Sequence, residues 1–226
     1  RSAISHWKNE DDSPEQAASK ATTYYEETFA KIYAAYQVAL RKCQAVDFDD
    51  LILETVHLLE TEDEVRARYA GKFRHVLVDE FQDTNGLQLV LVKLLSCVHG
   101  NVFVVGDDDQ SIYGWRGARV ENIQCFARDV PGTVTVRLEQ NYRSTGTVLA
   151  AANALIANND GRLGKNLWTA DRAGEAIVYY TAYNETDEAR FVAERVQEWP
   201  DAGGTRSETG ILYRSNAQSR ALEQEL

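Results

Sequence analysis

The sequence predicts an α/β protein in which strands of a parallel sheet follow an all-helical N-terminal segment. Residues 1–72 show helix caps and helical spacing, whereas from His75 onward short apolar runs alternate with longer stretches of helical period. The apolar run at 76–78 ends abruptly in acidic residues, and the run at 102–105 is followed by acidic residues after a single glycine. This pattern is typical of strands whose carboxyl ends meet at the ligand-binding edge of an open parallel sheet.

The helical segment contains two clear helix starts. Ser13 is placed to cap a helix, with Pro14 in its first turn and Gln16 at the capping-box position. A second helix opens at Asp47, and a short third one covers about 62–70. Spacings of three and four predict one buried face, made of Tyr25, Phe29, Ile32, Tyr36 and Leu40. The second helix is expected to bury Phe48, Leu51 or Ile52, Thr55 and Leu58 or Leu59.

Beyond residue 75 the strands and helices alternate. The apolar runs predict strands at 76–78, 102–105, 133–138, 176–180 and 211–213. The stretches of helical period predict helices at 87–95, 144–158, 184–198 and from 216 onward. Because the first two strands are apolar without alternation, we expect helices on both faces of their sheet.

Composition limits the kind of protein. A net charge of −11 argues against a general nucleic-acid-binding surface, so any such contact must be local. Three widely spaced cysteines, Cys43, Cys97 and Cys125, fit reduced core thiols. No apolar run reaches the roughly 18 residues of a membrane span and no signal-peptide core is present, which predicts a cytoplasmic protein without a membrane partner. The sequence contains no methionine, so we expect it to be part of a longer chain.

Asp79 and Glu80 follow the first predicted strand directly. Adjacent carboxylates at such a strand end can serve a bound Mg²⁺-nucleotide, one holding the metal and one orienting water, as in a Walker B motif. The alternative is that both acids begin a solvated loop or cap the next helix.

A second polar cluster follows the next strand. Gln110 is placed to meet a terminal phosphate, since an amide can donate to a phosphate oxygen and orient a water. Tyr113 and Trp115 lie among glycines and an arginine, which favours stacking on nucleic-acid bases. The alternative for Trp115 is a buried side chain that plugs a loop.

A third cluster follows the run at 133–138. Arg143 lies at a predicted strand-to-helix junction, from which an arginine can reach a phosphate across a cleft, and Tyr142 can stack on a base. Alone, this string more often marks a capped helix start, but the three clusters in this order strengthen one another.

Four segments resemble motifs of the superfamily 1A DNA helicases, the UvrD/PcrA/Rep family. Val78–Thr84, Gly106–Ala118 and Leu138–Ser144 resemble motifs II, III and IV, and Tyr213–Arg220 resembles motif IVa. Asn153–Asn159 and Gly161–Trp168 favour the UvrD branch. The resemblance covers nearly the whole chain and is looser over the first 40 residues.

The resemblance implies a motor that uses ATP and Mg²⁺ to unwind duplex DNA in the 3′ to 5′ direction. Asp79 would bind Mg²⁺ with Glu80 beside it, and Glu80 would be the general base for the attacking water. Gln110 would sense the γ-phosphate, Arg143 would reach it from a second RecA-like domain, and Tyr142 would stack on the adenine.

DNA contacts are implied in the same way. Tyr113 and Trp115 would stack on bases, and Phe48 and Asn216 would make further contacts with DNA. Arg116 would couple the DNA-binding loop to the catalytic glutamate. The implied partners are single-stranded DNA, single-strand/double-strand junctions and repair or replication proteins.

The resemblance divides the chain into a helical subdomain (1–72) and parts of two RecA-like domains of the P-loop NTPase type (73–138 and 139–226). A Walker A loop, Gly-x-x-x-x-Gly-Lys-Ser/Thr, is absent, and so are motifs V and VI. The string at 161–166 has the wrong spacing and no hydroxyl after Lys165. These 226 residues alone are therefore expected to be inactive.

Two other functions remain open on the sequence. One is a non-catalytic, helicase-derived module that binds DNA or docks a partner, which needs no Walker A loop. The other is the motor of a helicase-nuclease, which a nuclease domain further downstream would reveal.

Overall fold

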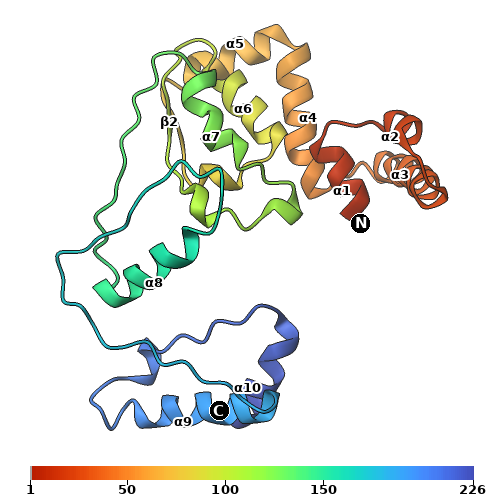
Figure 1. The fold of residues 1–226 in the computed structure, drawn as a ribbon. Coiled ribbons are helices and arrows are strands. Elements are labelled where there is room, and N and C mark those ends of the chain that lie inside the picture. Colours follow the sequence, from red (N-terminus) through yellow and green to blue (C-terminus); the bar gives the residue numbers. More distant parts are fainter. Residues whose placement is uncertain (1) are drawn as a thin grey trace. The chain divides into compact units, whose positions relative to one another are not determined.

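The computed structural model describes residues 2–226 and divides into two units (Figure 1). The first unit runs through Ser144 and adds Leu149–Ala170. The second unit joins Thr145–Val148 to Asp171–Leu226. None of the described helices combines the length and the apolar character needed to cross a membrane.

The first 72 residues are helical as predicted. The helices are α1 (Ser2–Asn9), α2 (Pro14–Lys20), α3 (Tyr24–Lys42), α4 (Phe48–Thr61) and α5 (Asp63–Lys72). The caps at Ser13 and Asp47 are confirmed, each as a capping box with the residue three positions on. These reciprocal hydrogen bonds satisfy backbone N–H groups that would have no partner at a helix start.

The predicted buried face of α3 is mostly wrong. Tyr25, Phe29 and Ile32 are exposed, Tyr36 and Leu40 are only partly buried, and the helix instead buries Ala30 and Tyr33. The buried pair packs with Ala17, Ile4 and Trp7. Because the short helices α1 and α2 cover only a narrow strip of α3, the predicted face remains in solvent along the first half of the helix.

The predicted face of α4 is partly wrong as well. Its buried apolar side chains are Leu53, Val56 and Leu59, of which only Leu59 was expected. Among the expected core residues, Ile52 packs against this core at partial exposure, whereas Phe48, Leu51, Thr55 and Leu58 are exposed. Apolar residues surround α4 on more than one side, so their period alone did not determine which side faces α6 (Gly86–Ser96).

The sheet consists of two parallel strands, β1 (Val76–Val78) and β2 (Val102–Val104), connected through α6. Val76 pairs with Val102 and Val78 with Val104. Helices α5 and α6 lie beside the strands in Figure 1. Leu77 is 71% and Phe103 61% exposed, so the prediction that both faces are covered is wrong. One face of this small sheet remains open in the described chain.

The remaining predicted strands do not form within the described residues. Segments 133–138, 176–180 and 211–213 are irregular, because none finds a neighbouring strand to satisfy its backbone groups. The later helices are α7 (Glu121–Asp129), α8 (Gly146–Ile156), α9 (Glu185–Glu198) and α10 (Ser219–Glu225). All except α7 were expected from the sequence, and Asn184 caps α9 as predicted.

The three cysteines are free, as predicted, but only partly as core thiols. Cys125 is half-buried, whereas Cys43 and Cys97 are exposed. Both exposed cysteines directly follow the last residue of a helix, where the chain turns into solvent.

Candidate functional site

The two predicted carboxylates lie at the carboxyl end of β1. Asp79 and Glu80 are both exposed, and the Glu80 backbone is left-handed, with φ of 49° and ψ of 44°. The chain then turns inward through Phe81, whose N–H donates to the Val105 carbonyl at 2.9 Å. The Phe81 ring is buried against Phe126 of α7, with ring centres 5.4 Å apart. This turn anchors the acids at the edge of the sheet.

Gln82 connects the ends of the two strands. Its Nε2 donates to Glu80 Oε2 at 2.8 Å, and its Oε1 accepts the Asp107 N–H at 2.9 Å. Gly106 allows this close approach, because a Cβ atom at that position would lie 2.6 Å from Gln82 Oε1. The side chain of Gln82 therefore links the acid pair to the loop after β2.

Gln110 lies in that loop, held by Asp107. The amide Nε2 of Gln110 donates to Asp107 Oδ2 at 2.6 Å, and Lys165 forms an ion pair with the same carboxylate. Burial of Asp107 opposes its ionisation, but the Lys165 ammonium and the Gln110 amide outweigh burial and lower the pKa of Asp107. The carboxylate is thus a charged anchor for the Gln110 side chain.

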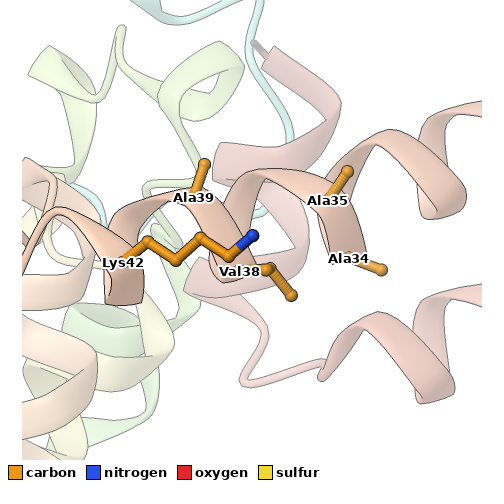
Figure 2. Close-up of a pocket in the computed structure, with 5 residues that line it drawn as sticks. All are labelled: Ala34, Ala35, Val38, Ala39 and Lys42. Carbon is orange, nitrogen blue, oxygen red and sulfur yellow. The ribbon is translucent and has the colours of Figure 1, made fainter.

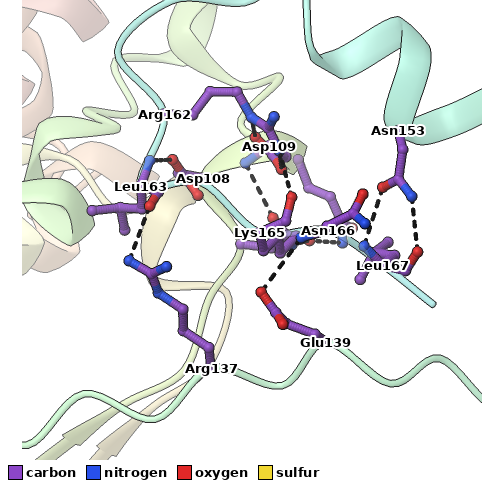
Figure 3. A network of polar contacts seen from close by, with 12 residues as sticks. Asp108, Asp109, Arg137, Glu139, Asn153, Arg162, Leu163, Lys165, Asn166 and Leu167 are labelled. Atoms are coloured by element: carbon purple, nitrogen blue, oxygen red, sulfur yellow. Dashed lines mark hydrogen bonds and ion pairs between the residues drawn. The ribbon is translucent and has the colours of Figure 1, made fainter.

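The neighbouring acids are also paired (Figure 3). Arg162 binds Asp109 through two hydrogen bonds, from Nε at 2.6 Å and from a terminal nitrogen at 2.5 Å. The Leu163 N–H donates to Asp108 Oδ2 at 2.7 Å. The carboxylates of Asp107, Asp108 and Asp109 lie close together, but each accepts a hydrogen bond from a protein donor. The cluster therefore serves to hold the loop after β2 in place.

Tyr113 and Trp115 project from the turn that follows. Trp115 is 73% exposed, which contradicts the alternative of a buried loop plug. The Arg116 guanidinium lies 4.5 Å from the Trp115 ring centre and 5.2 Å from that of Tyr113. The two ring centres are 6.4 Å apart. The turn therefore presents two aromatic faces beside a positive charge, an arrangement suited to stacking bases near a phosphate.

The other predicted site residues are exposed. Phe48 begins α4 and is 81% exposed, and Asn216 lies in a short helical turn of the second unit. Tyr142 and Arg143 are exposed in the loop before α8. Among the described residues, no hydrogen bond or ion pair joins Arg143 to Glu80 or Gln110; its N–H donates to Asn141 Oδ1.

The acid pair suits a magnesium ion by the chemistry of its donors. Mg²⁺ prefers oxygen ligands and usually keeps several waters, so exposed carboxylates can hold it. Asp79 Oδ1 accepts the Glu80 N–H at 2.9 Å and Glu80 Oε2 accepts the Gln82 amide. Within the described chain, the second oxygen of each carboxylate carries no hydrogen bond and is open to a metal or to water.

Sequence reasoning did not assign a role to Gln82, Arg162 or Lys165. Gln82 stands two residues after Glu80, and a polar residue next to the buried Phe81 was the available signal. The pairing of Arg162 and Lys165 with the loop after β2 joins residues more than 50 positions apart, and no local pattern predicts it.

A shallow groove lies along α3 (Figure 2). Its volume is about 450 Å³, and it is lined by Ala34, Ala35, Val38, Ala39 and Lys42. Lys42 is the only titratable side chain in this lining, so the groove offers no pair of groups for acid-base catalysis.

Two family models match the chain. The model of the UvrD/REP helicase N-terminal domain matches residues 1–131, and that of the UvrD-like helicase C-terminal domain matches residues 136–226. These matches confirm the resemblance that the motifs predicted.

Curated relatives support the same assignment. DNA helicase II of Escherichia coli (strain K12) is 56% identical over 201 residues, which are 89% of this chain and 28% of the relative. ATP-dependent DNA helicase PcrA of Staphylococcus aureus (strain Mu50 / ATCC 700699) is 50% identical over 222 residues, 98% of this chain and 30% of the relative. The chain thus spans less than a third of the length of these relatives.

Proposed function

We propose that the chain forms part of an ATP-dependent motor that unwinds DNA, because it belongs to the UvrD/Rep family of DNA helicases. The proposed direction is 3′ to 5′, and the proposed setting is cytoplasmic DNA repair or replication. The observation that carries the proposal is the link from Glu80 through Gln82 to the loop that holds Gln110. It joins the two groups that nucleotide hydrolysis needs, a base for water and a donor for phosphate.

In this proposal the first RecA-like part supplies the groups that act on water. Glu80 accepts the proton of the attacking water through its open oxygen, and Gln110 donates to the terminal phosphate. Asp79 would hold Mg²⁺, which when bound neutralises phosphate charge. Arg143 would reach the same phosphate from the second RecA-like part, and Tyr142 would stack on the adenine.

The division into a helical subdomain (1–72) and two motor parts (73–138 and 139–226) belongs to the same proposal. Because the 226 residues contain no Walker A loop, nothing in them grips the β-phosphate. The isolated chain should therefore release no phosphate from ATP, with or without single-stranded DNA. Phosphate release at a helicase-like rate from the isolated chain would contradict this expectation.

The proposed DNA substrate is a single strand and its junction with a duplex. Tyr113 and Trp115 offer stacking faces that tolerate any base, and Arg116 adds a nearby positive charge. This local surface is compatible with a chain of net charge −11, because stacking needs no extended basic patch. Phe48 and Asn216 would add contacts elsewhere along the strand.

The test of the proposal replaces Glu80 by glutamine in the full-length protein that carries this chain. Glu80→Gln should leave ATP and DNA binding nearly unchanged and lower DNA-stimulated turnover by about 100-fold or more, as for the loss of a general base. Glu54→Gln, at an exposed position on α4, is the matched control and should keep normal turnover. Turnover of Glu80→Gln equal to that of the unmodified protein would remove Glu80 from the proposed role.

A further inference from the structure

We propose that Gln82 is a positioning residue that holds the Glu80 carboxylate in register with the loop carrying Gln110. The inference rests on the proposed function, in which Glu80 is the base and Gln110 meets the terminal phosphate. It assigns to a buried amide the task of keeping these two groups in a fixed relation while both remain exposed.

The burial of Gln82 makes its hydrogen bonds specific. Its side chain is 1% exposed, so water does not compete for either end of the amide. Nε2 donates to a carboxylate, which only accepts, and Oε1 accepts from the Asp107 N–H, which only donates. Rotating the amide by half a turn would place two donors together and two acceptors together. The surroundings therefore select one orientation of the amide.

That orientation determines which oxygen of Glu80 is available. Glu80 Oε2 is occupied by the Gln82 amide, and within the described residues the other oxygen carries no hydrogen bond. A base held by one oxygen presents the second in a restricted direction, which is the geometric requirement for abstracting a proton from a positioned water.

The opposite end of Gln82 connects to Gln110 through one residue. Asp107 offers its backbone N–H to Gln82 and its carboxylate to Gln110, at 2.9 Å and 2.6 Å. A displacement of the loop that moves Asp107 therefore disturbs the hydrogen bonds of both the Gln82 and the Gln110 side chains. The contact requires glycine at position 106, where a Cβ would meet both Gln82 Oε1 and the Ile123 side chain at less than 3 Å.

The experiment compares two variants in the full-length protein. Gln82→Glu keeps an acceptor for the Asp107 N–H but replaces the donor to Glu80 by a second carboxylate. Gln82→Met has similar volume and removes both hydrogen bonds without adding charge, which keeps the test valid if the glutamate variant does not fold. The matched control is Gln88→Glu, because Gln88 occupies the capping-box position of α6, where glutamate serves equally well.

Both Gln82 variants should lower the ATPase kcat by about 10- to 100-fold and leave the KM for ATP within about twofold, whereas Gln88→Glu should change neither. In a Glu80→Gln background, the Gln82 variants should cause no further loss of kcat, because residues that act as one unit are not additive. Thermal unfolding of the same variants measures any loss of stability, which a purely structural role of Gln82 would cause.

Normal kcat per folded molecule in both Gln82 variants, with only a lower melting temperature, would overturn the positioning role and leave the proposed function intact. A further loss of kcat in the Glu80→Gln background, as large as the loss that the Gln82 variant causes alone, would overturn the positioning role as well. Normal turnover of Glu80→Gln itself would reject the base assignment, and with it the inference.

Discussion

Replacing Trp115 by alanine should weaken the binding of single-stranded DNA to the full-length protein by about 5- to 160-fold. This range corresponds to the loss of about 1–3 kcal/mol for one base stacked on an aromatic ring. The Trp115 ring is 73% exposed, so its removal opens no cavity in a packed core. The free energy of unfolding should therefore change by no more than about 1 kcal/mol, the usual value of an exposed contact between a guanidinium and an aromatic ring.

The assay is fluorescence anisotropy of a labelled single-stranded oligonucleotide at several salt concentrations. Stacking releases no counterions, so the variant should bind more weakly at every salt concentration while the salt slope stays the same. Tyr183→Ala is the matched control, since Tyr183 is an exposed aromatic side chain before α9 with no proposed contact to DNA. Its affinity should equal that of the unmodified protein.

Two results would refute the reasoning about Trp115. Unchanged affinity would show that bases do not stack on this ring. A large loss of thermal stability together with a smaller salt slope would show that the ring supports the fold and that the DNA contact was lost indirectly.

Two further predictions concern charge. Arg143→Ala should lower the kcat for ATP far more than it weakens nucleotide binding, since such an arginine acts mainly on transition-state charge; an unchanged kcat would place Arg143 outside the site. The pKa values of Asp47 and Asp107 are both lowered, because hydrogen bonds from Lys8 and Lys165 outweigh the burial that opposes ionisation. Their stabilising contribution should be complete above the ordinary value near 3.8 and should disappear as the pH falls through the lower folded values, which thermal unfolding between pH 5 and pH 2 would measure. A melting temperature independent of pH over that range would contradict this expectation.

Helix boundaries were predictable because capping is a local interaction. Ser13, Asp47 and Asn184 each accept a backbone N–H three residues ahead, so a few neighbouring residues carry the whole signal. Which side of each helix is buried depends on distant partners. Tyr33 rather than Tyr36 is buried in α3 because α1 and α2 happen to cover that strip, and nothing within α3 encodes this choice.

The same distinction separates the strands that form from those that do not. Val76–Val78 and Val102–Val104 satisfy each other's backbone groups, whereas the run at 133–138, which alternates apolar and polar residues, has no neighbouring strand among the described residues. Chemical roles were suggested by residue type at strand ends, as for Asp79 and Gln110. The amide that joins the two strand ends could not be predicted, because Gln82 and Asp107 meet only after the sheet has formed.

The left-handed backbone at Glu80 affects how substitutions at this position change the stability of the protein. A residue with a long side chain adopts that conformation at a cost of about 1–2 kcal/mol, whereas asparagine or glycine adopts it more easily. Asparagine at position 80 would relax the backbone and at the same time remove the carboxylate that the chemistry uses. Selection for heat resistance alone would therefore drive this position away from glutamate, and selection for turnover would restore it.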